Sequence, residues 1–140
     1  MAKARLEDVL GYVPLFRDLP KRHIKQLAAL CDVAEYMADA PIVKEGDPGD
    51  AFYVVLKGQA KVTVKGRFVQ RLLPGDHFGE IAVLDGGERT ATVRSETEMQ
   101  LVILTRGDLM KAVKNDPSLS VNLLTELAKM IRRVTKSPVE

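Results

Sequence analysis

Short strand-like segments separated by glycine and proline turns fill the middle of the 140-residue chain. Several alternate apolar and polar residues, as the segment 60–65 does, and this period of two is typical of half-buried strands. The turns include Pro74-Gly75 and Gly86-Gly87. Many short strands at this spacing predict a β-sandwich or β-roll. The predicted strands are 41–44, 51–56, 59–64, 67–73, 90–95 and 98–104.

Apolar residues at helical spacing precede these strands. Pro20 is expected at the first position of a helix, where its missing N–H is not needed. The single cysteine, Cys31, continues the apolar face of that helix, so we expect it to be buried rather than disulfide-bonded. The first predicted helix carries Leu6, Val9, Leu10 and Val13, and the second carries Ile24, Leu27, Ala28 and Cys31.

Two further helices are predicted after the strands. The first begins near Arg106, and Asp116 and Pro117 are an N-cap and a first residue for a longer one. The longer helix has a broad apolar face, typical of packing on a core. Part of that face is also suited to cover a ligand or to pair with a second copy. The apolar face carries Leu119, Leu123, Leu124, Leu127, Met130, Ile131 and Val134, and the opposite face carries Asn122, Thr125, Glu126, Lys129, Arg132, Arg133 and Lys136.

Size and charge limit the class of protein. A chain of this length is expected to form one domain, 1–140, with a core of its own. The net charge of +2 gives no strong bias toward nucleic acid or membranes. The first eight residues are charged and no long apolar run follows, so neither a secretory signal nor a membrane segment is predicted. A cytoplasmic protein is the expectation.

The segment Gly75–Leu84 with Arg89 carries the chemistry of an anion site. Gly79 lets the backbone approach a ligand closely because it has no Cβ. A helix that starts there leaves the N–H groups of Ile81 and Ala82 free, and these groups attract an anion. The planar guanidinium of Arg89 matches two oxygens of a phosphate at once.

Two neighbouring side chains suit a sugar and a base. Glu80 repels phosphate, but its carboxylate accepts a hydrogen bond from a sugar hydroxyl. Thr90 adds a hydroxyl for the phosphate or for a purine edge. The plainer interpretation of Glu80 and Arg89 is a solvated surface ion pair, and that of Gly79 an ordinary turn glycine.

The combination of Phe78-Gly79-Glu80-Ile81-Ala82 with Arg89-Thr90-Ala91 resembles the phosphate-binding cassette of cyclic nucleotide-binding domains. This is the family of kinase regulatory subunits, cyclic-nucleotide-gated channels and the bacterial catabolite activator protein. The segments 13–19 and 44–58 resemble the family's N-terminal turn and central hairpin, so the likeness covers about residues 10–135. Asp39 stands where relatives often carry glycine, and Asp tolerates left-handed geometry nearly as well.

The resemblance implies an α+β fold, an antiparallel β-roll that is jelly-roll-like, with about eight strands. N-terminal helices in 1–32 and C-terminal lid helices in 106–136 would flank the roll, which would occupy 33–105 with the cassette at 75–93. It implies ligand contacts from Phe78, Gly79, Glu80, Ile81, Ala82, Arg89, Thr90 and Ala91. It also implies a base pocket at Val62, Val69 and Leu72, and Arg133 as a residue able to reach the base.

The implied function is a cyclic nucleotide sensor that changes the placement of its C-terminal helices when ligand binds. In the family, a threonine at the position of Thr90 often accompanies binding of cGMP. We nevertheless favour cAMP, because that messenger is common among bacterial members. No catalytic residue, no metal and no cofactor beyond this ligand is expected. The expected partners are the nucleotide and a protein or a second copy at the C-terminal helix, without a DNA-binding domain in this chain.

Other classes of protein fit the residues less well. A metal enzyme on a similar roll needs clustered histidines, and only His23 and His77 exist. An iron–sulfur sensor needs several cysteines, and a haem sensor would depend on His77. Two alternatives stay open. One is a nucleotide-free interaction module of the same fold, and the other is a regulatory piece of a larger transcription factor, channel or kinase.

Overall fold

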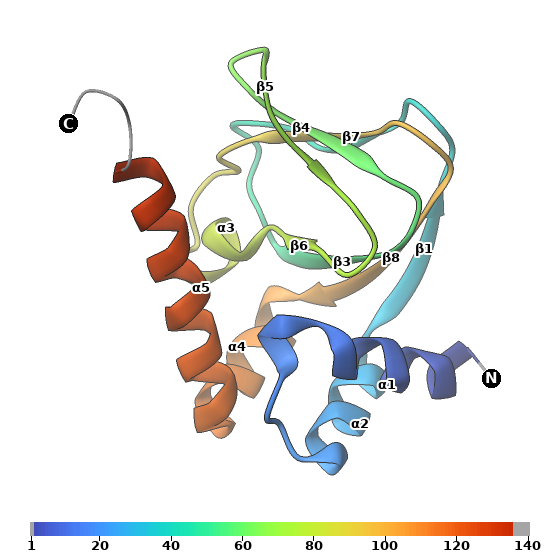
Figure 1. Cartoon of the computed structure of the whole chain (residues 1–140), viewed down its shortest axis with the longest axis vertical. Coiled ribbons are helices and arrows are strands. Elements are labelled where there is room, and N and C mark those ends of the chain that lie inside the picture. The colour runs from blue at the N-terminus through green and yellow to red at the C-terminus, as the bar shows by residue number, and fades with distance from the viewer. Residues whose placement is uncertain (1, 136–140) are drawn as a thin grey trace. The chain divides into compact units, whose positions relative to one another are not determined.

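The computed structural model describes residues 2–135 and builds the middle of the chain from antiparallel strands (Figure 1). One sheet has the strand order β1-β8-β3-β6 and the other β2-β7-β4-β5. The antiparallel β-roll predicted from the sequence is confirmed. Its strands are β1 Asp32–Tyr36, β2 Pro41–Val43, β3 Ala51–Lys57, β4 Ala60–Val64, β5 Arg67–Leu72, β6 His77–Phe78, β7 Thr92–Ser95 and β8 Met99–Thr105.

Side chains from both sheets meet in one apolar core inside the roll. Alternate residues of β3, such as Tyr53 and Val55, pack against Ala60 and Val62 of β4 and Leu101 of β8. Six of the strands follow the predicted segments, and β1 and β6 were not among them. Both lack the apolar alternation of the others, since β1 is largely exposed and β6 has only two residues.

The helices begin at residues suited to starting them. Asp116 caps the last helix, because its Oδ1 accepts a hydrogen bond from the N–H of Ser118 at 3.1 Å, and Pro117 is the first helical residue as predicted. Pro20 precedes its helix by one residue and accepts hydrogen bonds from the N–H groups of His23 and Ile24. The helices are α1 Ala2–Tyr12, η1 Pro14–Phe16, α2 Lys21–Leu30, α3 Glu80–Asp85, α4 Arg106–Asn115 and α5 Pro117–Thr135.

The chain divides into two compact units. The roll unit is Leu30–Met110, close to the predicted limits of 33 and 105, and it includes α3 and the first half of α4. The helical unit combines the start of the chain with residues from Lys111 onward. Within the helical unit, the Asn122 amide donates to the carbonyl of Leu15 at 3.0 Å. A single domain over 1–140 stays a prediction.

The apolar face predicted for α5 is only partly buried. Leu119 and Leu123 are buried, whereas Leu124 and Ile131 are exposed. Val134 and Lys136 were also assigned to the faces of this helix. The side chain of Val134 and the whole of Lys136 lie outside the described part of the chain. Cys31 follows the end of α2 and is buried, as predicted.

Candidate functional site

Gly79 lies at the junction of β6 and α3, in a conformation that only glycine adopts without strain. Its φ is +93°, and it is the N-cap residue of α3. A Cβ placed there would lie 2.8 Å from the carbonyl oxygen of Ala51 and 2.8 Å from Nη1 of Arg89. The backbone at Gly79 is therefore held close to both β3 and the arginine, as a cassette glycine should be.

The short helix α3 begins at the predicted position. The N–H of Val83 donates to the carbonyl of Gly79 at 3.3 Å, which is the bond that closes the first turn. The N–H groups of Ile81 and Ala82 precede that bond, so they have no carbonyl one turn back within the helix. Two backbone donors thus lie directly after Gly79, at the positive end of the helix dipole.

Arg89 is buried within the roll unit, with 6% of its surface exposed. Its Nη2 donates a hydrogen bond to the carbonyl oxygen of Ala51 at 3.0 Å. Its Nη1 is buried and makes no hydrogen bond to any residue in the described range 2–135. A buried cationic donor is stabilised by an acceptor, and leaving it without one costs free energy. The arrangement therefore calls for an anion.

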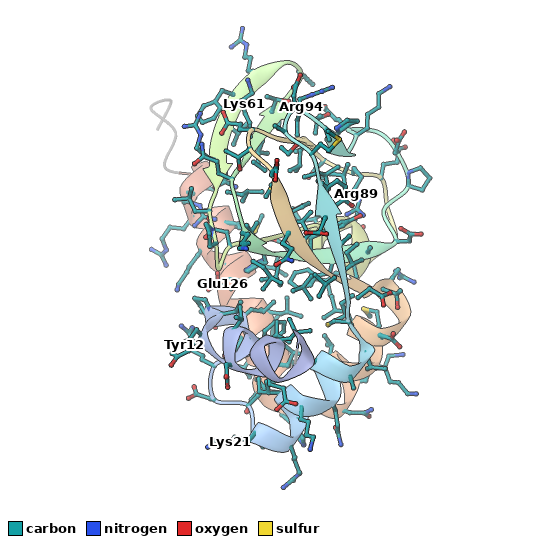
Figure 2. All side chains as sticks on the ribbon, turned by 90° about the vertical axis from the view of Figure 1, so that its right-hand side faces the viewer. Tyr12, Lys21, Lys61, Arg89, Arg94 and Glu126 are labelled. Atoms are coloured by element: carbon teal, nitrogen blue, oxygen red, sulfur yellow. The ribbon has the colours of Figure 1, made fainter. Side chains whose placement is uncertain are left out.

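A cavity of about 430 Å³ opens beside this guanidinium. Arg89 and Tyr53 line it together with the strand β2 and the turn that follows β2. Figure 2 shows Arg89 among the strands of the roll. The remaining lining residues are Pro41, Ile42, Val43, Lys44, Asp47, Pro48 and Asp50.

Glu80 is buried as well, with 7% of its surface exposed. Its Oε2 lies 3.6 Å from Nδ1 of His77, three residues earlier. Among residues 2–135, Glu80 and Arg89 form no ion pair with each other. The solvated surface pair that was the plainer interpretation is therefore not what the structure shows. The carboxylate and the guanidinium are separate buried groups, each suited to its own part of a ligand.

Tyr53 lies beside Arg89 and was not among the site residues predicted from the sequence. Its ring stacks on that of Phe78 with a centroid distance of 4.7 Å and an interplanar angle of 7°. Cζ of Arg89 lies 5.6 Å from the centroid of the same ring. Burial raises the pKa of the Tyr53 hydroxyl, and the positive charge of Arg89 acts in the opposite direction. The only signal in the sequence was an aromatic residue in β3, and its partners depend on the register between distant strands.

The base-pocket residues behave differently from one another. Val62 and Leu72 are buried in the core of the roll, as predicted. Val69 is 53% exposed, so it is not packed in the core beside them, and its contact with a base stays a prediction. Val62 pairs with Gln70 whereas Thr63 pairs with Phe68, which leaves Val69 as the extra residue of a β-bulge. The bulge is a feature of the strand pairing that the family resemblance did not reveal.

The remaining predicted contacts are spread over the chain. Phe78 is buried in the core of the roll, where it stacks on Tyr53. Thr90 is exposed and Ala91 is half-buried, and both precede β7. Arg133 is exposed near the end of α5, in the helical unit. Ligand contacts by these residues stay predictions.

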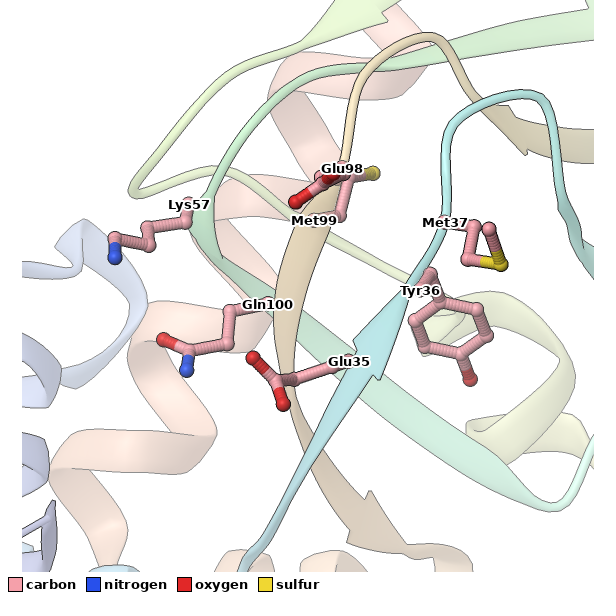
Figure 3. Close-up of a pocket in the computed structure, with 7 residues that line it drawn as sticks. All are labelled: Glu35, Tyr36, Met37, Lys57, Glu98, Met99 and Gln100. Atoms are coloured by element: carbon pink, nitrogen blue, oxygen red, sulfur yellow. The ribbon is translucent and has the colours of Figure 1, made fainter.

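A second cavity, of about 360 Å³, lies on the first sheet (Figure 3). Glu35, Gln100 and Lys57 come from neighbouring strands there and point to the same side of the sheet. None of the predicted site residues lines this cavity. The full lining set is Glu35, Tyr36, Met37, Lys57, Glu98, Met99 and Gln100.

Among the described residues, no group of three or more His, Cys, Asp or Glu side chains is arranged to hold a metal ion. Within the same range, none of the helices has both the length and the apolar character needed to cross a membrane.

Comparison with known proteins adds independent findings. The family model described as "Cyclic nucleotide-binding domain" matches residues 33–116, more than half of the chain. The cAMP-dependent protein kinase regulatory subunit of Emericella nidulans is 39% identical over 102 residues, which are 71% of this chain and 25% of that protein. The CRP-like cAMP-activated global transcriptional regulator of Mycobacterium tuberculosis is 27% identical over 139 residues, 94% of this chain and 61% of that protein.

Solved structures show the same fold. The Catabolite Activator Protein of Thermus thermophilus matches with a TM-score of 0.81 and 31% identity. The match covers 87% of this chain and 60% of that one. The chain thus spans about a quarter to three fifths of these relatives.

Proposed function

Because the chain belongs to the cyclic nucleotide-binding domain family, we propose that it is a sensor of a cyclic nucleotide, with cAMP favoured over cGMP. The observation that carries this proposal is Arg89, a buried cation with one guanidinium nitrogen lacking an acceptor among the described residues. Gly79 lies against that nitrogen, and the first turn of α3 follows at once. A cyclic phosphodiester provides the acceptor oxygens that these donors lack.

The proposed binding mode assigns one part of the nucleotide to each group. The cyclic phosphate accepts hydrogen bonds from Nη1 of Arg89 and from the N–H groups of Ile81 and Ala82. The carboxylate of Glu80 accepts a hydrogen bond from the ribose 2′-hydroxyl. The base packs on the apolar side chains of Val62 and Leu72, with Val69, Ala91 and Arg133 as additional predicted contacts.

The preference for cAMP is supported by the relatives rather than by the site. The kinase regulatory subunit and the transcriptional regulator are both named for cAMP. Thr90 keeps a hydroxyl next to the phosphate site, and this hydroxyl is equally able to pair with a guanine edge. The choice of base is therefore the first question for experiment.

The proposed output is a change in the helices after residue 105. Arg106, the first residue of α4, donates a hydrogen bond from Nε to the carbonyl of Val83 in α3 at 2.7 Å. A shift of α3 on binding phosphate would therefore act directly on the start of α4. The ligand can move this equilibrium only as far as its affinities for the two states differ. We propose a cytoplasmic binding module of this kind, acting as a regulator and not as an enzyme.

Calorimetric titration of the purified chain with cAMP and with cGMP tests the proposal. We expect binding in the micromolar range or tighter for at least one of them, and loss of roughly a hundred-fold in affinity for Arg89→Ala, about 2.7 kcal/mol. Hydrogen exchange in α4 and α5 with and without ligand tests the switch. Absence of heat with both nucleotides, from folded protein free of bound ligand, would favour a nucleotide-free interaction module instead.

A further inference from the structure

The hairpin formed by β4 and β5 concentrates positive charge. Residues 60–75 contain four basic side chains and no acidic one, although the whole chain has a net charge of only +2. The basic residues are Lys61, Lys65, Arg67 and Arg71. Like charges in one hairpin repel one another, and on an edge strand they also discourage pairing with another copy of the same strand.

The hairpin also lies at an open edge of its sheet. β5 is the last strand in the order β2-β7-β4-β5, and its only neighbour in that sheet is β4. Five consecutive residues of β5, from Arg67 to Arg71, are exposed. Two of them are large apolar side chains, Phe68 at 54% and Val69 at 53% exposure. Figure 1 shows the tip of this hairpin reaching beyond the other strands of the roll.

The face beside this edge carries a row of three cations. Lys61 pairs across the strands with Arg71 on one side and with Arg94 of β7 on the other. Lys61 and Arg94 are labelled close together in Figure 2. Two carboxylates offset part of the charge. Glu96 accepts two hydrogen bonds from Arg71, and Asp39 accepts one from Arg94 at 3.3 Å.

Carboxylates also lie near two other cations of the hairpin, since Lys61 lowers the pKa of Glu96 and Glu45 accepts a hydrogen bond from the N–H of Lys65 at 2.9 Å. Among residues 2–135, the side chains of Lys61, Lys65 and Arg67 form no ion pair. The unpaired charge therefore lies along β4, β5 and their turn, next to the exposed apolar side chains of Phe68 and Val69. A partner must match charge and apolar surface at the same place.

The positive charge of the hairpin and the backbone groups at the edge of β5 together indicate the class of partner. Two copies of the hairpin repel each other, so pairing of β5 with itself is disfavoured and a segment of opposite charge is favoured. An edge strand also presents a row of backbone N–H and C=O groups, and another peptide backbone satisfies both. A nucleic acid or a lipid headgroup offers acceptors for the cations but no such ladder.

We propose that the edge strand β5 docks an extended acidic segment of a partner protein. The segment adds to the second sheet as a further strand, with backbone hydrogen bonds to β5. Its carboxylates lie beside Arg67 and attract the charge of Lys61 on the strand behind it, and an apolar side chain covers Phe68. This interaction requires no nucleotide and is additional to the sensor function.

Amide NMR of the full chain, labelled with ¹⁵N, tests the proposal with two synthetic heptapeptides. One is Glu-Thr-Glu-Val-Glu-Thr-Glu, and the other has lysine in place of every glutamate. We expect the acidic peptide to shift the amide signals of residues 67–72, and the shifts to weaken strongly when ionic strength is raised to about 0.5 M. We expect the lysine peptide to leave those signals in place.

Charge reversal distinguishes the edge from general attraction. Arg67→Glu should weaken binding of the acidic peptide roughly tenfold, while Lys25→Glu, the same charge change on exposed α2, should leave it nearly unchanged. The unaltered amide signals of the roll report that each variant is folded. Equal binding of both peptides, equal loss in both variants, or no shift at β5 would overturn the proposal. Tighter binding at β5 of a single-stranded RNA decamer or of phosphatidylserine vesicles would also overturn it.

Discussion

Arg89 and Arg71 both belong to the β-roll unit, and their surroundings are opposite. Arg89 is buried, its Nη2 donates to the carbonyl of Ala51, and its Nη1 has no acceptor among the described residues. Arg71 is largely exposed, makes two hydrogen bonds to Glu96, and lies 5.3 Å from the centroid of the Phe68 ring. Arg71 thus has its acceptors within the protein, whereas Nη1 of Arg89 has none among the described residues.

The glycine beside Arg89 gives the largest expected effect on stability. Gly79→Ala would bring a Cβ to 2.8 Å from the Ala51 carbonyl at a φ of +93°. We expect a loss of about 3 kcal/mol in the free energy of unfolding, from strain together with steric conflict. Urea denaturation measures it. Gly75→Ala is the matched control, because its φ is +95° with nothing within 4 Å, and it should cost about 1 kcal/mol. Equal losses would show that contact with Arg89 and β3 is irrelevant.

Replacing the aromatic ring of Tyr53 gives the next largest expected effect, on the affinity for cAMP. Tyr53→Leu should lower the affinity for cAMP roughly tenfold, because the guanidinium loses a face that holds it in place. Tyr53→Phe keeps that face and should stay within about twofold of wild type. Calorimetry of both variants measures the effect, and the same pair in the Arg89→Ala background tests its origin. If Tyr53 acts through Arg89, Tyr53→Leu should hardly change the affinity for cAMP in the Arg89→Ala variant. A tenfold loss of affinity in that variant would contradict this role.

Replacing the exposed Arg71 gives the smallest expected effect, a change in the pKa of Glu96. The hydrogen bond from Arg71 lowers the pKa of Glu96 from its ordinary value, and Lys61 lowers it further. The pair therefore stabilises the fold at pH values above the unfolded pKa of this carboxyl, and the contribution disappears as pH falls through the folded value. Arg71→Gln should raise the Glu96 midpoint in a carboxyl NMR titration and leave the affinity for cAMP unchanged. An unmoved midpoint would mean that the ion pair is not formed in solution.

Local signals in the sequence predicted those parts of the site that depend on neighbouring residues. Gly79 was predicted from the need for close approach, and its φ agrees. Asp39 was expected to replace a glycine, and it has a φ of +58°. Asp116 was predicted as an N-cap and accepts the expected hydrogen bond. For Asp39 and Asp116 the deciding feature lies within a few residues of the side chain, and for Gly79 the sign of φ is likewise local.

The features that were missed depend on pairing between distant strands. The bulge at Val69 is defined only by the register of β5 against β4, so neither the residue pattern nor the family resemblance revealed it. The contact of Tyr53 with Arg89 joins residues 36 positions apart in the sequence. No local periodicity encodes either feature, because register and long-range packing arise only when the sheets assemble.

The comparison between the two arginines is tested most directly by changing each to lysine and measuring the affinity for cAMP. Lysine keeps the charge but lacks the planar guanidinium. The affinity for cAMP should therefore fall only where the planar group contacts the ligand. We predict that Arg89→Lys loses roughly tenfold or more in affinity and that Arg71→Lys stays within about twofold of wild type. An Arg89→Lys variant that binds cAMP like wild type, or equal losses at the two positions, would contradict the assignment of Arg89 as the group that holds the phosphate.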